Sequence, residues 1–414
     1  MKIAFMLGEF PCLSETFVLN QITSLLKRGH SISIFAERGS TTTERHPDVD
    51  RFGLQPLTRY EHMPRRFGAR ALRLPTIFEA SRPFVRSLDV RRYGGWAASF
   101  RLAWASHMVA GAPEFDIIQC HFGALGLKAV LLRDTGALSG KIVTAFHGED
   151  ITNYPRRFRG NHYAPLFASG DLFLPISLRW NRALIAMGCP PDRIRQHSMG
   201  VDTSQFAQRS GTRLTTPLRI ISIARLVEKK GIADALHAVA LLEQDVHYVI
   251  VGDGPLRAEL EELAQTLGIA ARVAFRGAQP RQQVAEELRS ADVLLAPSVT
   301  GGDGDIEGVP VSIMEAMACG IPVVSTRHSA IPELVHDGTT GFLVDEHDVD
   351  GASDRLGRLL ADAAMRARMG AAGHDVIMRD FNIETLTDRL EQHYRDLLML
   401  PPRACAHRST RVRA

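Results

Sequence analysis

Short apolar runs that end in Gly, His or Ser alternate along the chain with longer segments of helical periodicity. This alternation is typical of strand–helix–strand units, in which helices bury parallel strands on both faces. In the first half, the predicted strands are KIAFML (2–7), SISIFA (31–36), FDIIQC (115–120), KIVTAF (141–146) and DLFLPI (171–176). In the second half, they are LRIISIA (218–224), VHYVIVG (246–252), RVAFRG (272–277), DVLLAPS (292–298) and IPVVST (321–326).

These two series predict an α/β chain with two doubly wound, Rossmann-like parallel-sheet domains that face a cleft. A polar stretch rich in Ser and Thr lies between them and indicates an interdomain linker. The expected organisation is a domain at 1–205, the linker at 206–216, a domain at 217–380, a helix at 381–400 that packs back on the first domain, and a disordered basic tail at 401–414. Ligands of such sheets bind beyond the carboxyl ends of the strands, so functional residues are expected directly after strands.

Length and composition support two separate cores. The chain has 414 residues, of which 45% are hydrophobic. Its formal net charge of +3 is too small to argue for a nucleic-acid partner. The cysteines stand far apart, which favours free thiols in a reducing, cytoplasmic compartment. They are Cys12, Cys120, Cys189, Cys319 and Cys405.

The apolar run at the N-terminus, from Ile3 to Leu7, is shorter than the apolar region of a signal peptide. It is interpreted as a first buried strand. No segment reaches the ~18 uncharged apolar residues of a membrane-spanning helix. Any contact with a membrane is therefore expected to be peripheral.

The segment EGVPVSIMEAMACGIPVVST (307–326) places two acids around the start of a predicted helix. Pro310 suits the first helical position, because its missing N–H group costs nothing there. Free N–H groups near Val309 and the positive end of the helix dipole would form a site for a diphosphate. Carboxylates accept hydrogen bonds but do not donate them, so Glu307 and Glu315 are assigned to hydroxyl groups of the rings beside the phosphates.

A diphosphate also needs cations, and SIARLVEKKG supplies them at the end of a predicted strand. Arg225 and Lys230 stand in one strand-to-helix connection, so both can reach one anion. Taken alone, these charges and Glu315 would be solvated side chains. The segment GDGP at 252–255 would be a tight turn, since it lacks the spacing of a dinucleotide-binding fingerprint.

These segments occur together and in order. ARLVEKKG, VIVGDGP, the two acids and AMACGIPVVST resemble the retaining glycosyltransferases of family 4, which have the two-domain GT-B fold. The resemblance covers nearly the whole second domain. It implies that Arg225 and Lys230 hold the donor diphosphate. It also implies that Glu307 contacts the transferred sugar and that Glu315 contacts the ribose, while Ala224 departs from the usual Gly.

The resemblance further implies that the first domain binds the acceptor, that the second binds the donor and that FRG (275–277) lines the base pocket. The donor-binding residues expected are Arg225, Lys230, Gly252, Gly254, Arg276, Gly277, Glu307, Gly308, Val309, Pro310, Val311 and Glu315. The catalytic residues expected are His147, Arg225, Lys230 and Glu307.

Two histidines of the first domain follow predicted strands and are expected to face the cleft. His121 follows FDIIQC, and His147 begins HGED, which resembles the family's histidine segment beside the donor sugar. A lone histidine at a strand end is more often structural than functional. His121 and Asp150 are assigned to the acceptor side of the cleft.

GEFPCLSETFV, directly after the first strand, resembles a bacterial subset of the family associated with exopolysaccharide assembly, including colanic-acid-type and amylovoran-type enzymes. The pattern predicts a turn at Pro11 and a helix N-cap at Ser14. Glu15 and Thr16 are then expected to face an acceptor. A plain capped helix explains the same string nearly as well.

The segment from Arg51 to Arg101 contains eleven arginines against three acids. Next to it, Trp96, Phe100, Trp104 and Met108 recur every four residues as one apolar helical stripe. Such a stripe alone is more often core than membrane surface. Beside so many arginines, it suggests a surface for anionic lipid headgroups or a lipid-linked acceptor on the inner face of the cell membrane.

The resemblance implies transfer of a hexose from a UDP- or GDP-sugar to a hydroxyl of an oligosaccharide, expected to be lipid-linked, with retention of configuration. No obvious carboxylate nucleophile is present, which favours a front-face route. No cofactor or metal is expected, since the cations already neutralise the diphosphate, although Asp303 and Asp305 form an Asp-x-Asp arrangement. A nucleotide-sugar epimerase of related fold and a non-catalytic nucleotide-sugar-binding protein stay open as alternatives.

Overall fold

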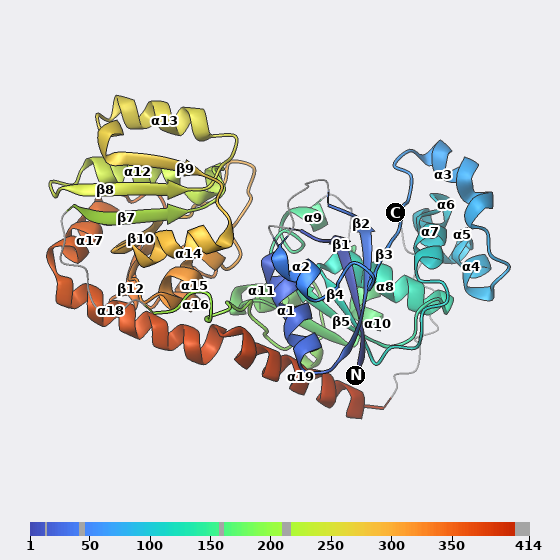
Figure 1. The fold of residues 1–414 in the computed structure, drawn as a ribbon. Coiled ribbons are helices and arrows are strands. Elements are labelled where there is room, and N and C mark those ends of the chain that lie inside the picture. Colours follow the sequence, from blue (N-terminus) through green and yellow to red (C-terminus); the bar gives the residue numbers. More distant parts are fainter. Residues whose placement is uncertain (13–14, 41–45, 157–160, 209–216, 402–414) are drawn as a thin grey trace. The chain divides into compact units, whose positions relative to one another are not determined.

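The structure is a computed structural model that describes residues 1–12, 15–40, 46–156, 161–208 and 217–401 (Figure 1). Two compact units make up the chain. The first unit comprises Met1–Ile176, Trp180–His197 and the chain from Thr387, and the second comprises Ser177–Arg179 and Ser198–Leu386. The main crossing between them thus lies at 197/198, before the expected boundary at 205, and most of the expected linker lies outside the described residues.

The first unit is built on a six-stranded sheet with the order β3-β2-β1-β4-β5-β6. All neighbouring strands run parallel. The strands are β1 (Lys2–Glu9), β2 (Ser31–Arg38), β3 (Thr58–Tyr60), β4 (Ile117–His121), β5 (Lys141–Phe146) and β6 (Leu172–Pro175). The chain changes direction across the sheet between β1 and β4, which is where ligands bind in such sheets.

The second unit repeats this arrangement with the order β12-β11-β10-β7-β8-β9, again with parallel neighbours. The strands are β7 (Leu218–Ile223), β8 (Val246–Val251), β9 (Val273–Gly277), β10 (Val293–Ala296), β11 (Val323–Thr326) and β12 (Gly341–Val344). The predicted fold class is confirmed: both units are doubly wound, Rossmann-like parallel sheets. The pattern missed the two short edge strands β3 and β12.

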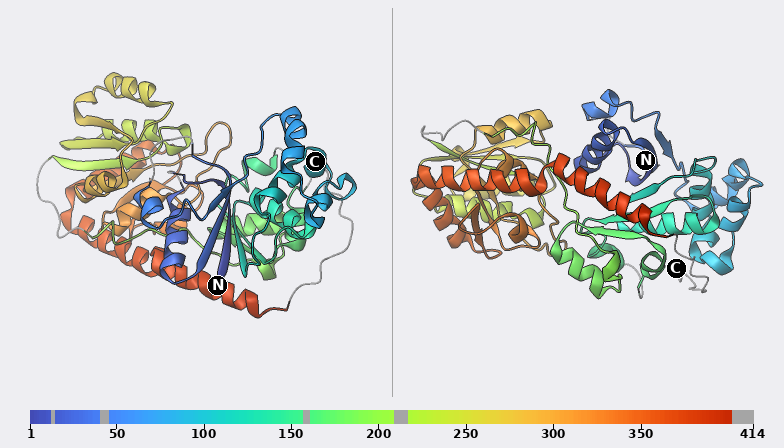
Figure 2. Two further views of the ribbon diagram at one scale, coloured as in Figure 1. Left: turned by 45° about the vertical axis from the view of Figure 1, so that its right-hand side comes forward. Right: turned by 90° about the horizontal axis from the view of Figure 1, so that it is seen from below.

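Helices cover both faces of the two sheets (Figures 1 and 2). In the chain up to 197 they are α1 (Thr16–Lys27), α2 (Pro47–Arg51), α3 (Phe67–Arg73), η1 (Leu74–Ile77), α4 (Arg82–Ser87), α5 (Val90–Tyr93), α6 (Gly95–Ala98), α7 (Arg101–Met108), α8 (Gly123–Thr135), α9 (Asn153–Arg156), α10 (Ala164–Ser169), α11 (Leu178–Ala186) and η2 (Pro191–Arg193). Helices α3 to α7 gather on one side of the first unit, next to α8.

The helices after residue 217 alternate with the strands of the second sheet until α17. They are η3 (Glu228–Lys230), α12 (Ile232–Ala240), α13 (Arg257–Thr266), η4 (Ala270–Arg272), α14 (Arg281–Arg289), α15 (Val311–Ala318), α16 (Ile331–Leu334), α17 (Val349–Ala361), α18 (Ala363–Val376), η5 (Ile377–Phe381) and α19 (Ile383–Met399). Among the described residues, no helix combines the length and the apolar character that crossing a membrane requires.

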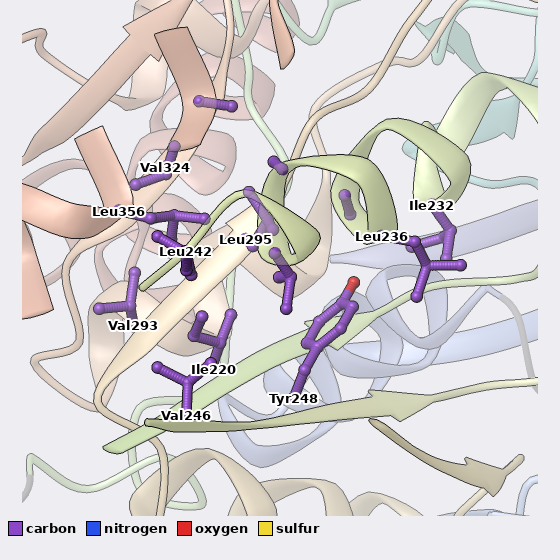
Figure 3. Packing of buried hydrophobic residues seen from close by; sticks show 14 of the residues in the cluster. Ile220, Ile232, Leu236, Leu242, Val246, Tyr248, Val293, Leu295, Val324 and Leu356 are labelled. Carbon is purple, nitrogen blue, oxygen red and sulfur yellow. The ribbon is translucent and has the colours of Figure 1, made fainter. Parts of the chain in front are cut away.

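The core of the second unit lies between its sheet and the covering helices (Figure 3). Ile220 on β7 and Val293 on β10 come from neighbouring central strands, and both are fully buried. Leu236 of α12 and Leu356 of α17 pack against this layer. Strands buried on both faces read as continuous apolar runs, which is why the sequence pattern identified them.

Helix α19 contributes to the first unit through its later turns. Tyr394 is fully buried, and its hydroxyl donates a hydrogen bond of 2.8 Å to the side-chain oxygen of Gln119 on β4. On the same helix, Glu391 pairs with Arg28 and His30. The expected helix at 381–400 thus begins at Ile383, and from Thr387 it belongs to the first unit. The expected basic tail lies outside the described residues apart from Pro401.

Candidate active site

Lys230 and Glu307 form an ion pair within the second unit. Lys230 ends η3, which follows β7, and Glu307 lies in the long connection from β10 to α15. Their side chains are 19% and 12% exposed, so solvent screens the pair only weakly. The sequence placed these two residues at one donor site, and the fold brings their charged groups together.

The two residues before Lys230 strengthen the link between the two connections. A carboxylate oxygen of Glu228 accepts a hydrogen bond of 2.9 Å from the backbone N–H of Gly302. The Lys229 ammonium lies 2.8 Å from a carboxylate oxygen of Asp305. Three successive residues of η3 therefore hold the acidic loop at 300–307.

Both acids of the Asp-x-Asp arrangement, Asp303 and Asp305, already have partners in the structure. Asp303 accepts a hydrogen bond of 2.8 Å from the backbone N–H of Asp305, whose own carboxylate pairs with Lys229. Across the described residues, no cluster of three or more His, Cys, Asp or Glu side chains has the arrangement of a metal site.

The two acids of the site have opposite pKa shifts. Burial alone would raise the pKa of Glu307, but the adjacent Lys230 ammonium outweighs it and lowers that pKa. Burial raises the pKa of Glu315 to about 7, and Arg281 opposes this only in part. At neutral pH, Glu307 is therefore ionised, whereas Glu315 is close to half-protonated.

Helix α15 starts next to this loop. Pro310 is its N-cap and Val311 its first residue, so the expected helix begins one position later than predicted. The first N–H groups of a helix have no intrahelical partner and point out of its N-terminus. Glu315 lies in the second turn and is 9% exposed. Gly308 is partly exposed and Val309 is buried.

Arg225 follows β7, and its side chain is exposed. In the described portion of the chain, no acidic side chain forms an ion pair with it, which leaves its charge available to an external anion. Two glycines of the GDGP turn pack against its connection. A Cβ atom on Gly252 would lie 1.8 Å from the carbonyl oxygen of Ala224, and one on Gly254 would lie 2.5 Å from that of Leu226.

Arg276 and Gly277 end the edge strand β9. The Arg276 side chain is exposed. The carbonyl oxygen of Gly277 accepts a hydrogen bond of 2.8 Å from the N–H of Gly252, which joins this strand end to the GDGP turn. The turn thus connects the expected base pocket to the connection that bears Arg225.

His328 was missed by the sequence reasoning. It follows β11, is 1% exposed, and its Nε2 accepts a hydrogen bond of 3.0 Å from the backbone N–H of Glu307. Its Nδ1 lies 2.7 Å from a carboxylate oxygen of Glu346. A histidine two residues after a predicted strand, in STRHSA, was the available signal.

In the first unit, His121 and His147 lie together at the ends of β4 and β5. The Nδ1 of His121 is 3.0 Å from the Nε2 of His147, and its Nε2 is 2.8 Å from the side-chain oxygen of Gln21. Burial lowers the pKa of His147 to about 3 and shifts that of His121 well below its usual value. Both imidazoles are therefore neutral.

Asp150 has a structural role in the turn after β5. One carboxylate oxygen accepts hydrogen bonds of 3.0 and 2.9 Å from the backbone N–H groups of His147 and Gly148. The other accepts one of 3.0 Å from Gly123, the first residue of α8. Asp150 is 3% exposed, so binding an acceptor, as the sequence suggested, would require these bonds to break.

The segment before α1 differs in detail from its prediction. Glu15 is the N-cap of α1, and Thr16 is the first helical residue. Ser14, the expected cap, lies outside the described residues. Burial, with a contribution from nearby Glu9, raises the pKa of Glu15 to about 7. Glu15 and Thr16 are both partly exposed.

The predicted aromatic stripe does not lie on one helix, because the chain breaks at Phe100, whose φ of 59° separates α6 from α7. Trp104 is buried in a cluster with Phe84 and Ala103, and Phe100 packs against it. Met108 is 5% exposed. Trp104 and Met108 therefore offer no membrane surface, because helical periodicity alone does not tell a buried face from an exposed one.

Two family models match the chain: Glycosyltransferase Family 4 over residues 14–205 and Glycosyl transferases group 1 over residues 204–376. The putative colanic acid biosynthesis glycosyltransferase WcaL of Salmonella typhimurium is 39% identical over 410 residues, which cover 94% of this chain and 98% of WcaL. The amylovoran biosynthesis glycosyltransferase AmsK of Erwinia amylovora is 37% identical over 397 residues, which cover 92% and 96%.

Solved structures give the same class of fold. A glycosyltransferase from Rickettsia africae matches with a TM-score of 0.73 at 15% identity, covering 96% of this chain and 99% of that one. Anabaena Alr3699/HepE in complex with UDP and glucose matches with a TM-score of 0.69 at 17% identity, covering 96% and 100%. The fold is that of the GT-B glycosyltransferases. The chain belongs to glycosyltransferase family 4, among the group 1 glycosyl transferases.

Proposed function

We propose that this protein transfers a hexose from a nucleotide diphosphate sugar, with UDP or GDP as the nucleotide, to a hydroxyl of a lipid-linked oligosaccharide during exopolysaccharide assembly. The observation that carries the proposal is the pairing of Lys230 with Glu307 beside the free charge of Arg225. Relatives named for colanic acid and amylovoran biosynthesis, similar over almost their whole length, support the class of product.

The chemistry follows from where charge develops. When the bond between sugar and diphosphate breaks, negative charge accumulates on the phosphate oxygens. Arg225, Lys230 and the N-terminus of α15 are the groups of the second unit suited to stabilise that charge. The lowered pKa of Glu307 keeps it an acceptor for sugar hydroxyls, and Glu315 is suited to the ribose.

The reaction proceeds with retention by a front-face route, in which the leaving phosphate takes the proton of the acceptor hydroxyl. His147 orients the sugar instead of acting as a base, because its low pKa makes it a poor proton acceptor. The reaction needs neither metal nor cofactor. The pairing of Asp305 with Lys229 supports this part of the proposal, since it already occupies one acid of the Asp-x-Asp arrangement.

The main test is the loss of the cations. Arg225→Ala and Lys230→Ala should each lower transfer by ~10²-fold or more, as loss of one charge-stabilising group does elsewhere. Arg355→Ala is the control, since this arginine lies on α17 and stacks over Phe342. A thermal-shift screen with UDP, GDP, ADP and their sugars identifies the donor. Near-native turnover of both variants would refute the proposal.

We also propose that helices α3 to α5 of the first unit bind an anionic membrane surface, the inner face of the cell membrane, where the lipid-linked acceptor lies. Five large apolar side chains in and between α3, η1, α4 and α5 are more than half exposed: Phe67, Leu72, Phe78, Val85 and Val90. Exposed arginines stand between them or next to them in the sequence: Arg65, Arg66, Arg73, Arg82 and Arg91. Apolar and cationic side chains together suit a surface of anionic headgroups.

Vesicle flotation at low salt tests this surface. The wild-type protein should float with vesicles that contain phosphatidylglycerol and not with phosphatidylcholine alone. Leu72→Ser with Phe78→Ser should weaken this binding by about tenfold, because apolar insertion and charge act together. Leu241→Ser is the matched control, since Leu241 is 53% exposed in the second unit. Equal flotation with both lipids, or no effect of the double variant, would count against the surface.

A further inference from the structure

His328 and Glu346 hold both ends of the acidic loop at 300–307. The backbone N–H of Glu307 donates to Nε2 of His328 over 3.0 Å. The backbone N–H of Thr300 donates to Glu346 over 2.7 Å, and the same carboxylate lies 2.7 Å from Nδ1 of His328. Two backbone groups seven positions apart are thus fixed by one pair of side chains.

The direction of each bond in this chain is determined. A backbone N–H can only donate, so Nε2 of His328 must present its lone pair to Glu307. An ionised carboxylate can only accept, so the proton of the imidazole resides on Nδ1 and points at Glu346. The two bonds together therefore require the tautomer of His328 that carries its proton on Nδ1. A second proton would have to enter Nε2, where it would face the N–H of Glu307.

The internal hydrogen bonds of the loop lie between Gly301 and Asp305 and leave Thr300 and Glu307 to contacts from outside it. TGGDGDIEGVP contains four glycines, whose backbones have wide conformational freedom. His328 and Glu346, by contrast, follow β11 and β12, two neighbouring strands of the sheet. The pair thus attaches the loop that carries Glu307 to the edge of the sheet.

We propose that His328 and Glu346 are positioning residues for Glu307, which fix its backbone so that its carboxylate meets both Lys230 and the sugar of the donor. The role in sugar binding rests on the proposed function. The anchoring of the loop and the tautomer of His328 do not depend on it. If the pair only stabilised the fold, its loss would destabilise the whole unit and would weaken binding of the diphosphate and of the nucleotide sugar equally.

Measurements on the free protein test the anchoring. In ¹⁵N-histidine spectra at neutral pH, His328 should show a protonated Nδ1 and an unprotonated Nε2. In His328→Leu, the amides at 300–307 should exchange with solvent at least about tenfold faster, because a bond of this kind contributes about that factor. Unchanged exchange, or the opposite tautomer, would overturn the proposal whatever the donor is.

Binding measurements test the consequence for the donor. They compare two ligands that the thermal-shift screen identifies, the nucleoside diphosphate and the corresponding nucleotide sugar. His328→Leu should weaken binding of the nucleotide sugar by about tenfold and change binding of the diphosphate by less than about twofold. His328→Gln should restore most of this affinity, because its amide both accepts and donates. Glu346→Leu should reproduce the loss, and Glu346→Gln should be milder.

The outcomes separate the two proposals. Equal weakening of diphosphate and nucleotide sugar, without rescue by His328→Gln, would overturn the positioning role even if the wild-type protein transfers sugar. Wild-type protein that binds no nucleotide sugar would refute the proposed function and the sugar-binding role with it. The exchange and tautomer measurements would then still decide whether the pair anchors the loop.

Discussion

The ammonium of Lys230 pairs with the carboxylate of Glu307 in the free protein, although the two groups are proposed to bind different parts of the donor. A diphosphate that arrives at Lys230 must therefore compete with Glu307 or share the cation with it. This exchange leaves the carboxylate free for a sugar hydroxyl once the phosphates are bound. The ion pair thus keeps both groups in place before the ligand arrives.

Removal of Lys230 alone should destabilise the second unit. Lys230→Met leaves Glu307 in a nearly buried position without its cation, and the free energy of unfolding should fall by about 2 kcal/mol. Adding Glu307→Gln removes the stranded charge, so the double variant should be more stable than Lys230→Met. Urea unfolding of the wild type, both single variants and the double variant measures the coupling. Additive single effects would contradict the ion pair.

Glu315 should make stability fall as pH rises. Its pKa is raised from 4.5 to about 7 in the folded protein, so its contribution is fully present below pH 4.5 and is lost as pH rises through 7. Glu315→Gln lacks this ionisation. Between pH 4.5 and 8, its free energy of unfolding should therefore rise relative to that of the wild type by at most about 3 kcal/mol. The same variant should bind the donor more weakly. Parallel urea curves at pH 5, 6, 7 and 8 provide the measurement, and a constant difference would contradict it.

The sequence predicted the strands best where an apolar run is long, because a strand that is buried on both faces appears in the sequence as a continuous apolar run. Strand β3 is TRY and β12 is GFLV, and both stand among polar residues. The equally short edge strand β6 was predicted because its LFLP lies within the longer apolar run DLFLPI. The second-unit residues were identified through a motif that spans many positions. His328 belongs to no such motif, and its role depends on a backbone group at 307 that no side-chain pattern reveals.

The environment of several first-unit residues could not be predicted, for one physical reason. An acid or an aromatic residue at a given spacing is compatible with opposite environments, and only packing decides between them. Asp150 follows a strand, as a ligand-binding acid would, yet its oxygens are occupied by three backbone N–H groups. Trp104 lies on a regular stripe, yet that face packs inward. Exposure, which identified Phe67 and Leu72, is not encoded in local periodicity.

His147 should have the opposite pH dependence to Glu315. Its pKa falls from 6.5 to about 3 on folding, so below pH 6.5 the unfolded chain binds a proton that the folded protein does not. The wild type should therefore lose up to about 1.4 kcal/mol per pH unit from this group as pH falls from 6.5 towards 3. Neither His147→Gln nor His147→Leu has this ionisation. As pH falls, the free energy of unfolding of both variants should therefore rise relative to that of the wild type, by the same amount per pH unit. Urea unfolding from pH 7.5 to 4.5 tests this, and unequal slopes would sink the assignment.

Gly231 determines where Lys230 lies, because it connects η3 to α12 with a positive φ of 63°. A Cβ atom there would lie 1.8 Å from the carbonyl oxygen of Pro297, so Gly231→Ala must displace one of the two backbones. We expect a loss of at least about 2 kcal/mol in the free energy of unfolding. Transfer should also fall, because the displaced segment carries Lys230.

Gly357→Ala on α17 is the matched control for this substitution. Its Cβ would meet only the side-chain nitrogen of Gln244, at an ordinary contact distance of 3.6 Å, and alanine favours a helix over glycine by about 1 kcal/mol. It should therefore leave transfer unchanged and leave stability equal or slightly higher. Thermal unfolding and initial rates of transfer, measured on both variants, distinguish a conformational requirement at 231 from a general intolerance of alanine. If Gly231→Ala instead keeps the stability and turnover of the wild type, the prediction is wrong, and the connection can move without displacing Lys230.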